Sequence, residues 1–362
     1  MTPALPTFPW DSLAEAKSLA AGHPDGVVDL SVGTPVDPVP PVVQEALTTA
    51  AAAPGYPTTH GTPELRAAAA AALERRHGVT VPAEDVLPTI GSKELVAWLP
   101  TLLGLGSADT VVIPELSYPT YEVGAKLAGA SVVRADGLLA LGPARPGLVW
   151  VNSPGNPTGR VLPVEHLRKV VAWTRERGSV LASDECYLTL GYGTEPEPLS
   201  VLHPSVCDGD LTGLLAVHSL SKSSSLAGYR AGFVTGDPEL VARLLATRKH
   251  AGMMVPRPVQ AAMTAALSDD THVAEQRSRF AARRAVLREA LEGAGFRIDH
   301  SEAGLYLWAT RDEPAWETVS WLATRGVLVA PGTFYGPAGE RHVRVALTAT
   351  DERVAQVSRR LA

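Results

Sequence analysis

The sequence has little cysteine and no long apolar segment. Its 362 residues include only two cysteines, Cys186 and Cys207, which cannot build a disulfide framework and are typical of a reducing compartment. No apolar run approaches the ~20 residues that a membrane-spanning helix needs. The first ten residues show no basic stretch followed by an apolar one, so we expect no signal peptide. These absences predict a cytoplasmic protein that does not bind membranes.

Several signatures of cofactors and partners are also missing. No G-x-G-x-x-G follows a predicted strand, and no G-x-x-x-x-G-K-[ST] occurs, which disfavours dinucleotide and P-loop binding. The ten histidines and two cysteines show no metal-ligand spacing, so we expect no metal. The formal charge of −6 is spread along the chain without a basic block. Nucleic acid is therefore not expected as a partner.

Short apolar runs alternate with helix-like stretches between residues 27 and 236. Many of the runs are continuously apolar, which indicates strands covered on both faces, as in a largely parallel sheet. One helix is predicted to begin at Thr62-Pro63-Glu64 and to stop at Gly78, and another to cover Pro163–Arg177. The alternation predicts a doubly wound α/β sheet. The expected strands are Val27–Val32, Val86–Ile90, Thr110–Ile113, Ser131–Ala135, Leu148–Asn152, Val180–Asp184, Leu214–Leu220 and Ala231–Thr235.

The pattern changes after Pro238. Helical stretches at Glu239–His250 and His272–Gly293 precede a group of short strands, which is typical of a smaller α+β domain. The length also fits two domains. We predict a large domain over residues 46–254, with residues 1–45 and 255–362 forming the N-terminal segment and the small domain. The strands expected there are Phe296–His300, Leu305–Thr310, Val327–Ala330 and His342–Leu347.

Lys222 stands out among only six lysines because it directly follows a predicted strand. Ligands of open α/β sheets bind at the carboxyl ends of such strands. A nucleophilic lysine must lose its proton although its ordinary pKa is about 10.4, and a nearby cation such as Arg230 favours the neutral amine. The hydroxyls of Ser219 and Ser221, with Arg230, could hold a phosphate. This segment alone is equally compatible with a plain surface loop.

Further segments carry a resemblance to a known family. Ser219, Lys222 and Arg230 have the spacing S-x-x-K-x₇-R, residues 152–159 read N-S-P-G-N-P-T-G, and residues 184–187 read D-E-C-Y. A strand, a glycine turn and a helix start follow one another at residues 89–94, which read T-I-G-S-K-E. Together these motifs resemble the class I/II aminotransferases, which are fold-type I enzymes dependent on pyridoxal phosphate (PLP). The resemblance runs over nearly the whole chain.

The resemblance implies a fold, a cofactor and a set of roles. The fold would be a large domain with a mostly parallel, doubly wound sheet plus a smaller α+β domain. Lys222 would carry PLP as a Schiff base, and Asp184 would pair with the pyridine nitrogen. The other implied cofactor contacts are Ser219, Arg230, Gly91, Ser92 and Lys93 to the phosphate, Asn156 and Tyr187 to the 3-oxygen, and Tyr118 stacked on the ring.

The same resemblance implies how substrate and partner subunit bind. Arg344 would grip the substrate α-carboxylate, and Gly33 would place a backbone group against it. Tyr56 would reach the phosphate of the neighbouring subunit, which makes a homodimer the expected assembly. Lys222, once released, would move a proton between the substrate Cα and the cofactor. A 2-oxo acid, commonly 2-oxoglutarate, would then receive the amino group and leave as glutamate.

The substrate suggested by the resemblance is N-succinyl-L,L-diaminopimelate, because several stretches resemble actinobacterial succinyldiaminopimelate aminotransferases of lysine and diaminopimelate biosynthesis. A departure follows the lysine, where residues 223–225 read S-S-S instead of R-S-N. The candidates to meet the succinyl-bearing tail are Lys93, Arg248, Lys249 and Arg257. An aminotransferase of other amino acids and a PLP-dependent carbon–sulfur lyase stay open as alternatives. A regulator on this fold would need an added DNA-binding segment, which we do not expect before residues 10–32.

Overall fold

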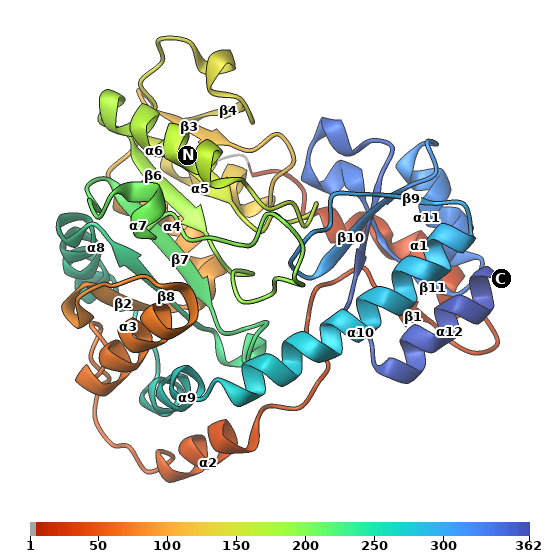
Figure 1. Cartoon of the computed structure of the whole chain (residues 1–362), viewed down its shortest axis with the longest axis horizontal. Helices are drawn as coiled ribbons and strands as arrows, with labels where there is room; N and C mark the ends of the chain where they lie inside the picture. Colours follow the sequence, from red (N-terminus) through yellow and green to blue (C-terminus); the bar gives the residue numbers. More distant parts are fainter. Residues whose placement is uncertain (1–4) are drawn as a thin grey trace.

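A seven-stranded sheet forms the centre of the larger part of the molecule (Figure 1). The structure is a computed structural model that describes residues 5–362. The strands lie in the order β2-β8-β7-β6-β5-β3-β4; β8 is antiparallel to both of its neighbours, and the other pairs are parallel. Their bounds are β2 Val86–Ile90, β3 Thr110–Ile113, β4 Ser131–Arg134, β5 Leu148–Asn152, β6 Val180–Asp184, β7 Leu214–Ser219 and β8 Ala231–Gly236.

Helices cover both faces of this sheet. Along β5, Leu148 and Trp150 belong to the same apolar cluster as α4, α5 and α8, whereas Val149 and Val151 belong to the cluster of α2, α3, α6 and α9. This alternation follows from the two-residue period of a strand. The predicted doubly wound, mostly parallel α/β sheet is confirmed. The helices are α2 Pro41–Thr49, α3 Pro63–His77, α4 Gly91–Leu102, α5 Thr120–Ala128, α6 Val164–Arg177, α7 Pro204–Cys207, α8 Pro238–Ala251 and α9 Arg257–Ser268.

Local capping signals explain where the helices begin and end. The Thr62 hydroxyl accepts a hydrogen bond of 3.2 Å from the backbone N–H of Leu65 at the start of α3. Gly78 ends that helix with a φ of 63°, in the left-handed region that favours glycine. Both predicted ends of this helix are therefore confirmed.

The smaller part is built on a four-stranded antiparallel sheet of order β12-β13-β10-β9. The predicted strand at residues 27–32 shrinks to β1, which pairs with β11 here and not with the large sheet. The predicted strand at residues 327–330 divides between two sheets, as β11 and β12. The bounds are β1 Val28–Asp29, β9 Arg297–Asp299, β10 Tyr306–Thr310, β11 Val327–Leu328, β12 Ala330–Pro331, β13 Val343–Ala346, α1 Ala14–Ala21, α10 Thr271–Gly293, α11 Ala315–Ala323 and α12 Asp351–Leu361.

The long helix α10 connects the two parts, running from beside α9 to α12 (Figure 1). Helix α9 packs against α2 and α3, and its residues Ala262 and Met263 are buried in the core of the large sheet. The division of the chain at residue 255 stays a prediction, and this packing favours a division within α10. Among residues 5–362, no helix is both long and apolar enough to cross a membrane.

Candidate active site

A cavity of about 1400 Å³ opens at the carboxyl ends of β6 and β7. Residues of the smaller part and of the N-terminal segment complete its walls, among them Tyr306, Phe334 and Trp10. Of the residues that the resemblance assigns to PLP or to the substrate α-carboxylate, all except Gly91 and Tyr56 line this cavity. They are Gly33, Ser92, Lys93, Tyr118, Asn156, Asp184, Tyr187, Ser219, Lys222, Arg230 and Arg344.

Lys222 lies in the turn that follows β7 and is half-buried. Its Nζ donates a hydrogen bond of 2.5 Å to the carbonyl oxygen of Gly33. A side chain at position 33 would overlap the hydroxyl of Tyr306, so only glycine lets the Tyr306 ring lie this close to the backbone. Among residues 5–362, no carboxylate pairs with Lys222. The Lys222 amine therefore faces the cavity and is held by two segments, its own loop and the one that contains Gly33.

A group of residues suited to bind an anion lines the same cavity as Lys222. Arg230 adopts a left-handed φ of 55°, and its guanidinium donates to the carbonyl oxygen of Ala227 at 2.6 Å. Gly91 does not line the cavity, but a Cβ there would overlap the Arg230 guanidinium, so the glycine makes room for it. Ser92 belongs to the first turn of α4, where free backbone N–H groups and the helix dipole favour an anion. No carboxylate of the described chain pairs with Arg230.

Asp184 supplies a buried negative charge at the end of β6. One carboxylate oxygen accepts a hydrogen bond of 2.7 Å from the hydroxyl of Tyr121, and the other accepts from the backbone N–H of Cys186 at 3.2 Å. Burial raises the pKa of Asp184, whereas these hydrogen bonds and the charge of Lys222 oppose the rise. The arrangement suits a cationic ligand atom. Tyr121 was missed by sequence reasoning, because nothing distinguishes it from a packed tyrosine one turn after Tyr118.

Arg344 is almost fully buried on β13, with 2% of its surface exposed. Its two terminal nitrogens donate to Asn156 Oδ1 at 2.9 Å and to the carbonyl oxygen of Ser31 at 2.7 Å. The ring of Tyr306 lies 4.0 Å from the guanidinium carbon, and the Tyr306 hydroxyl is 3.1 Å from that of Tyr187. The Nε of Arg344 has no hydrogen-bond partner in the described chain. A buried guanidinium held only by neutral oxygens is suited to receive a carboxylate.

The four cations expected to meet a substrate tail lie in different places. Lys93 is exposed at the cavity wall, with its Nζ 5.6 Å from the centre of the Phe8 ring. Arg248 is fully buried and forms two hydrogen bonds with Glu94, at 2.8 and 3.0 Å, so its expected role in substrate binding is wrong. Lys249 and Arg257 are exposed and do not line the cavity.

Comparison with known proteins identifies the family. The family model described as aminotransferase class I and II matches residues 25–361. The chain belongs to this aminotransferase family. It is 69% identical to a probable aminotransferase of Mycobacterium tuberculosis, over 99% of this chain and 85% of that protein. It is 60% identical to the 4-dedimethylamino-4-oxo-anhydrotetracycline transaminase of Streptomyces rimosus, over 99% of each chain.

Solved aminotransferases share the whole architecture. An aminotransferase of Neisseria meningitidis superimposes with a TM-score of 0.89 at 30% identity, over 99% of this chain and 97% of that one. A probable N-succinyldiaminopimelate aminotransferase of Thermus thermophilus gives a TM-score of 0.87, also at 30% identity, over 98% and 99% of the two chains. The fold is that of the fold-type I aminotransferases, as predicted.

This aminotransferase depends on PLP, as its family does. The residues on the cavity wall fit that group: a primary amine (Lys222), a guanidinium beside a helix N-terminus that has no carboxylate partner among residues 5–362 (Arg230), and a buried carboxylate (Asp184). They match the aldehyde, the phosphate and the pyridine nitrogen of PLP in chemical type. When bound, PLP supplies an electron sink for the substrate Cα.

Proposed function

We propose that this aminotransferase transfers the amino group of N-succinyl-L,L-diaminopimelate to 2-oxoglutarate. The observation that carries the proposal is the placement of two cations on one large cavity, with Arg344 buried and Lys93 exposed. A long amine with a carboxylate at each end requires such a pair. The similarity to the Thermus thermophilus protein named for this substrate supports it, as does a 31% identical LL-diaminopimelate aminotransferase of Dehalococcoides mccartyi.

In this proposal the chain's own groups divide the work. Arg344 binds the α-carboxylate with its planar guanidinium, and the Gly33 backbone lies against the same group. Lys222 holds and moves the proton at the substrate Cα. Asp184 keeps the pyridine nitrogen protonated through its negative charge. Ser219, Ser92 and Arg230 bind the phosphate, while Asn156 and Tyr187 orient the 3-oxygen and Tyr118 covers the ring.

A second candidate substrate is a bulky polycyclic ketone or amine, as in the name of the Streptomyces rimosus relative. The observation that favours it is the aromatic group at the cavity wall. The ring of Trp10 lies 5.6 Å from that of Phe8 and 5.4 Å from that of Phe334. Such a surface suits a flat apolar molecule better than a flexible dicarboxylate.

A substrate panel separates the two candidates. We expect the purified enzyme to convert N-succinyl-L,L-diaminopimelate with 2-oxoglutarate at a kcat/KM at least about tenfold above that for alanine, since two charge-assisted contacts bind the first and one binds the second. Formation of glutamate from 2-oxoglutarate and release of the oxo acid from the amine both measure the reaction in this direction. Preference for a tetracyclic amine over the succinylated amine would replace the first assignment with the second.

Variants at the two cations test how the substrate lies. Lys93→Ala should raise KM for the succinylated amine about two- to fivefold, as expected for an exposed ion pair, and should leave alanine unchanged. Arg344→Lys should raise KM about 10- to 100-fold for both amines, because lysine lacks the planar fork. Steady-state kinetics of both variants with both amines provide the comparison. An equal effect of Lys93→Ala on both amines would contradict distal recognition by Lys93.

We further propose that the active enzyme is a homodimer. Tyr56 is 96% exposed and lies away from the cavity of its own chain, which supports a role in a neighbouring site. Sedimentation equilibrium is expected to give twice the chain mass of 38.0 kDa. Tyr56→Phe should weaken PLP binding about fivefold through loss of one hydrogen bond, without changing that mass. A fully active monomer would contradict the proposal.

A further inference from the structure

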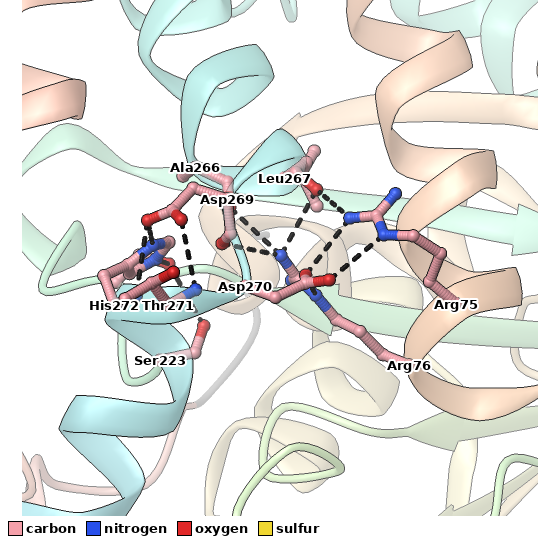
Figure 2. Close-up of polar contacts among 10 residues, drawn as sticks. Arg75, Arg76, Ser223, Ala266, Leu267, Asp269, Asp270, Thr271 and His272 are labelled. Carbon is pink, nitrogen blue, oxygen red and sulfur yellow. Dashed lines mark hydrogen bonds and ion pairs between the residues drawn. The ribbon is translucent and has the colours of Figure 1, made fainter.

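A serine, a histidine and an aspartate form a hydrogen-bonded chain behind the loop that carries Lys222. His272 Nδ1 lies 2.7 Å from Asp269 Oδ2, and His272 Nε2 lies 2.8 Å from the hydroxyl oxygen of Ser224 (Figure 2 shows the histidine and the aspartate). An ionised carboxylate only accepts hydrogen bonds, so Nδ1 donates to Asp269. With Nδ1 as the donor to Asp269, Nε2 of the neutral tautomer is the acceptor of a hydrogen bond from the Ser224 hydroxyl.

The order of these groups is that of a serine nucleophile with its base, but no substrate can reach Ser224. Ser224 is 1% exposed, and it does not line the large cavity. The small cavity nearby measures about 40 Å³ and is lined by the neighbouring Ser223. A space of that size holds about one water and no acyl group. We therefore infer that these hydrogen bonds serve to hold the loop that carries Ser224 and Lys222.

That loop needs an anchor. Ser225 adopts a left-handed φ of 53°, which residues other than glycine rarely adopt. Ser224 immediately precedes it and lies two residues from Lys222. Within the turn, the backbone N–H groups of Ser224 and Leu226 both donate to Leu220, at 3.2 and 3.3 Å. The hydroxyl bond to His272 adds a contact from another element to a conformation that the loop does not favour by itself.

Helix α10 also holds the other side of the Lys222 contact. Its Gln276 donates to Asp37 at 2.8 Å, and its Arg283 makes two hydrogen bonds with the same carboxylate, at 2.6 and 2.8 Å. Asp37 lies four residues after Gly33, whose carbonyl accepts from Lys222. Both partners of the Lys222–Gly33 hydrogen bond are therefore tied to α10, one through Ser224 and one through Asp37.

The start of α10 is itself fixed to the large part of the molecule. Asp270 accepts hydrogen bonds from Arg75 and Arg76 of α3, the shortest at 2.6 Å (Figure 2). Arg75 and Arg76 also donate to the Leu267 carbonyl at the end of α9, at 3.0 and 3.2 Å. The His272 side chain thus extends from a helix start that these hydrogen bonds anchor to α3 and α9.

We propose that Ser224, His272 and Asp269 are positioning residues for the known reaction. They hold the loop of Lys222 in the conformation that places Nζ at its working position in the cavity. Because α10 contacts both the Lys222 loop and the segment of Gly33, it keeps these two segments in a fixed position relative to each other. The role is independent of which amine the enzyme accepts, because none of the three side chains lines the cavity.

The test uses the PLP-loaded enzyme and four variants. Ser224→Ala and His272→Ala remove the bond, Ser224→Thr keeps the hydroxyl, and Thr271→Ala is a matched control at the exposed residue next to His272. We expect Ser224→Ala and His272→Ala to lower kcat about 10- to 100-fold with KM within about twofold, as expected for a misplaced catalytic group. Hydrogen exchange of the backbone at residues 220–226 should accelerate in the same two variants only.

Ser224→Thr should restore both the rate and the slow exchange to within about threefold of the parent, because one hydroxyl bond accounts for the effect. Overturning results are kcat and loop exchange in Ser224→Ala equal to those of Thr271→Ala, or exchange that accelerates evenly over the whole chain. Labelling of Ser224 by a fluorophosphonate would equally overturn the positioning role and make it a nucleophile.

Discussion

Replacing Lys222 with alanine is expected to lower the rate of each half-reaction about 10⁴-fold, the upper end of what proton transfer by a positioned side chain contributes. The amine of Lys222 is held at the carbonyl of Gly33 inside the cavity. Alanine leaves no group that can move a proton there. Single-turnover absorbance measurements of the bound cofactor with glutamate provide the rate.

The matched control for this variant is Lys249→Ala, an exposed lysine outside the cavity, which should keep the parent rate. Small primary amines added to the Lys222→Ala enzyme should recover part of the rate, because they can occupy the space left by the side chain and carry the proton. A Lys222→Ala enzyme that retains a tenth of the parent rate would exclude Lys222 as the proton carrier.

Asp184→Asn is expected to lower kcat about 10³-fold, since loss of the proposed buried ion pair with the pyridine nitrogen would cost ~4 kcal/mol. Asparagine keeps the shape of the side chain and removes only its charge. Tyr121→Phe is the matched control, because it removes the 2.7 Å hydrogen bond to Asp184 and leaves the charge. It should cost less than about tenfold. A nearly active Asp184→Asn enzyme would contradict the pairing with the pyridine nitrogen.

The Tyr121→Phe variant should also differ from the parent in the pH dependence of kcat. Burial raises the pKa of Asp184, and the Tyr121 hydrogen bond lowers it. In the proposed role the ionised carboxylate is the active form, so we expect activity to be present above this pKa and to be lost as the pH falls through it. Removing the hydrogen bond raises the pKa further, and the acid side of the kcat profile should shift to higher pH in Tyr121→Phe. A shift to lower pH would contradict this role of Tyr121.

Much of the fold and of the candidate site could be predicted from the sequence, because the signals are local. The apolar run 148–152 and the cap at Thr62 determine β5 and the start of α3 from neighbours within a few residues. Strand ends placed Asp184 and Lys222 at one edge of a sheet. Most of the residues predicted from motifs meet around one cavity, although their separate roles are still proposals.

Other features depended on partners that are distant in the sequence. Arg248 forms hydrogen bonds with Glu94, and His272 forms one with Ser224. These partners are 154 and 48 residues apart in the sequence. Tyr121 and Tyr306 read as packing residues until the chain brings them against Asp184 and Arg344. A charged or polar side chain has no local signal for its partner, because the free energy of burying it depends on what the tertiary structure places beside it. The sequence by itself determined most of the elements and indicated Lys222 as the proposed catalytic amine; only the tertiary structure decided which neighbours hold that amine in place.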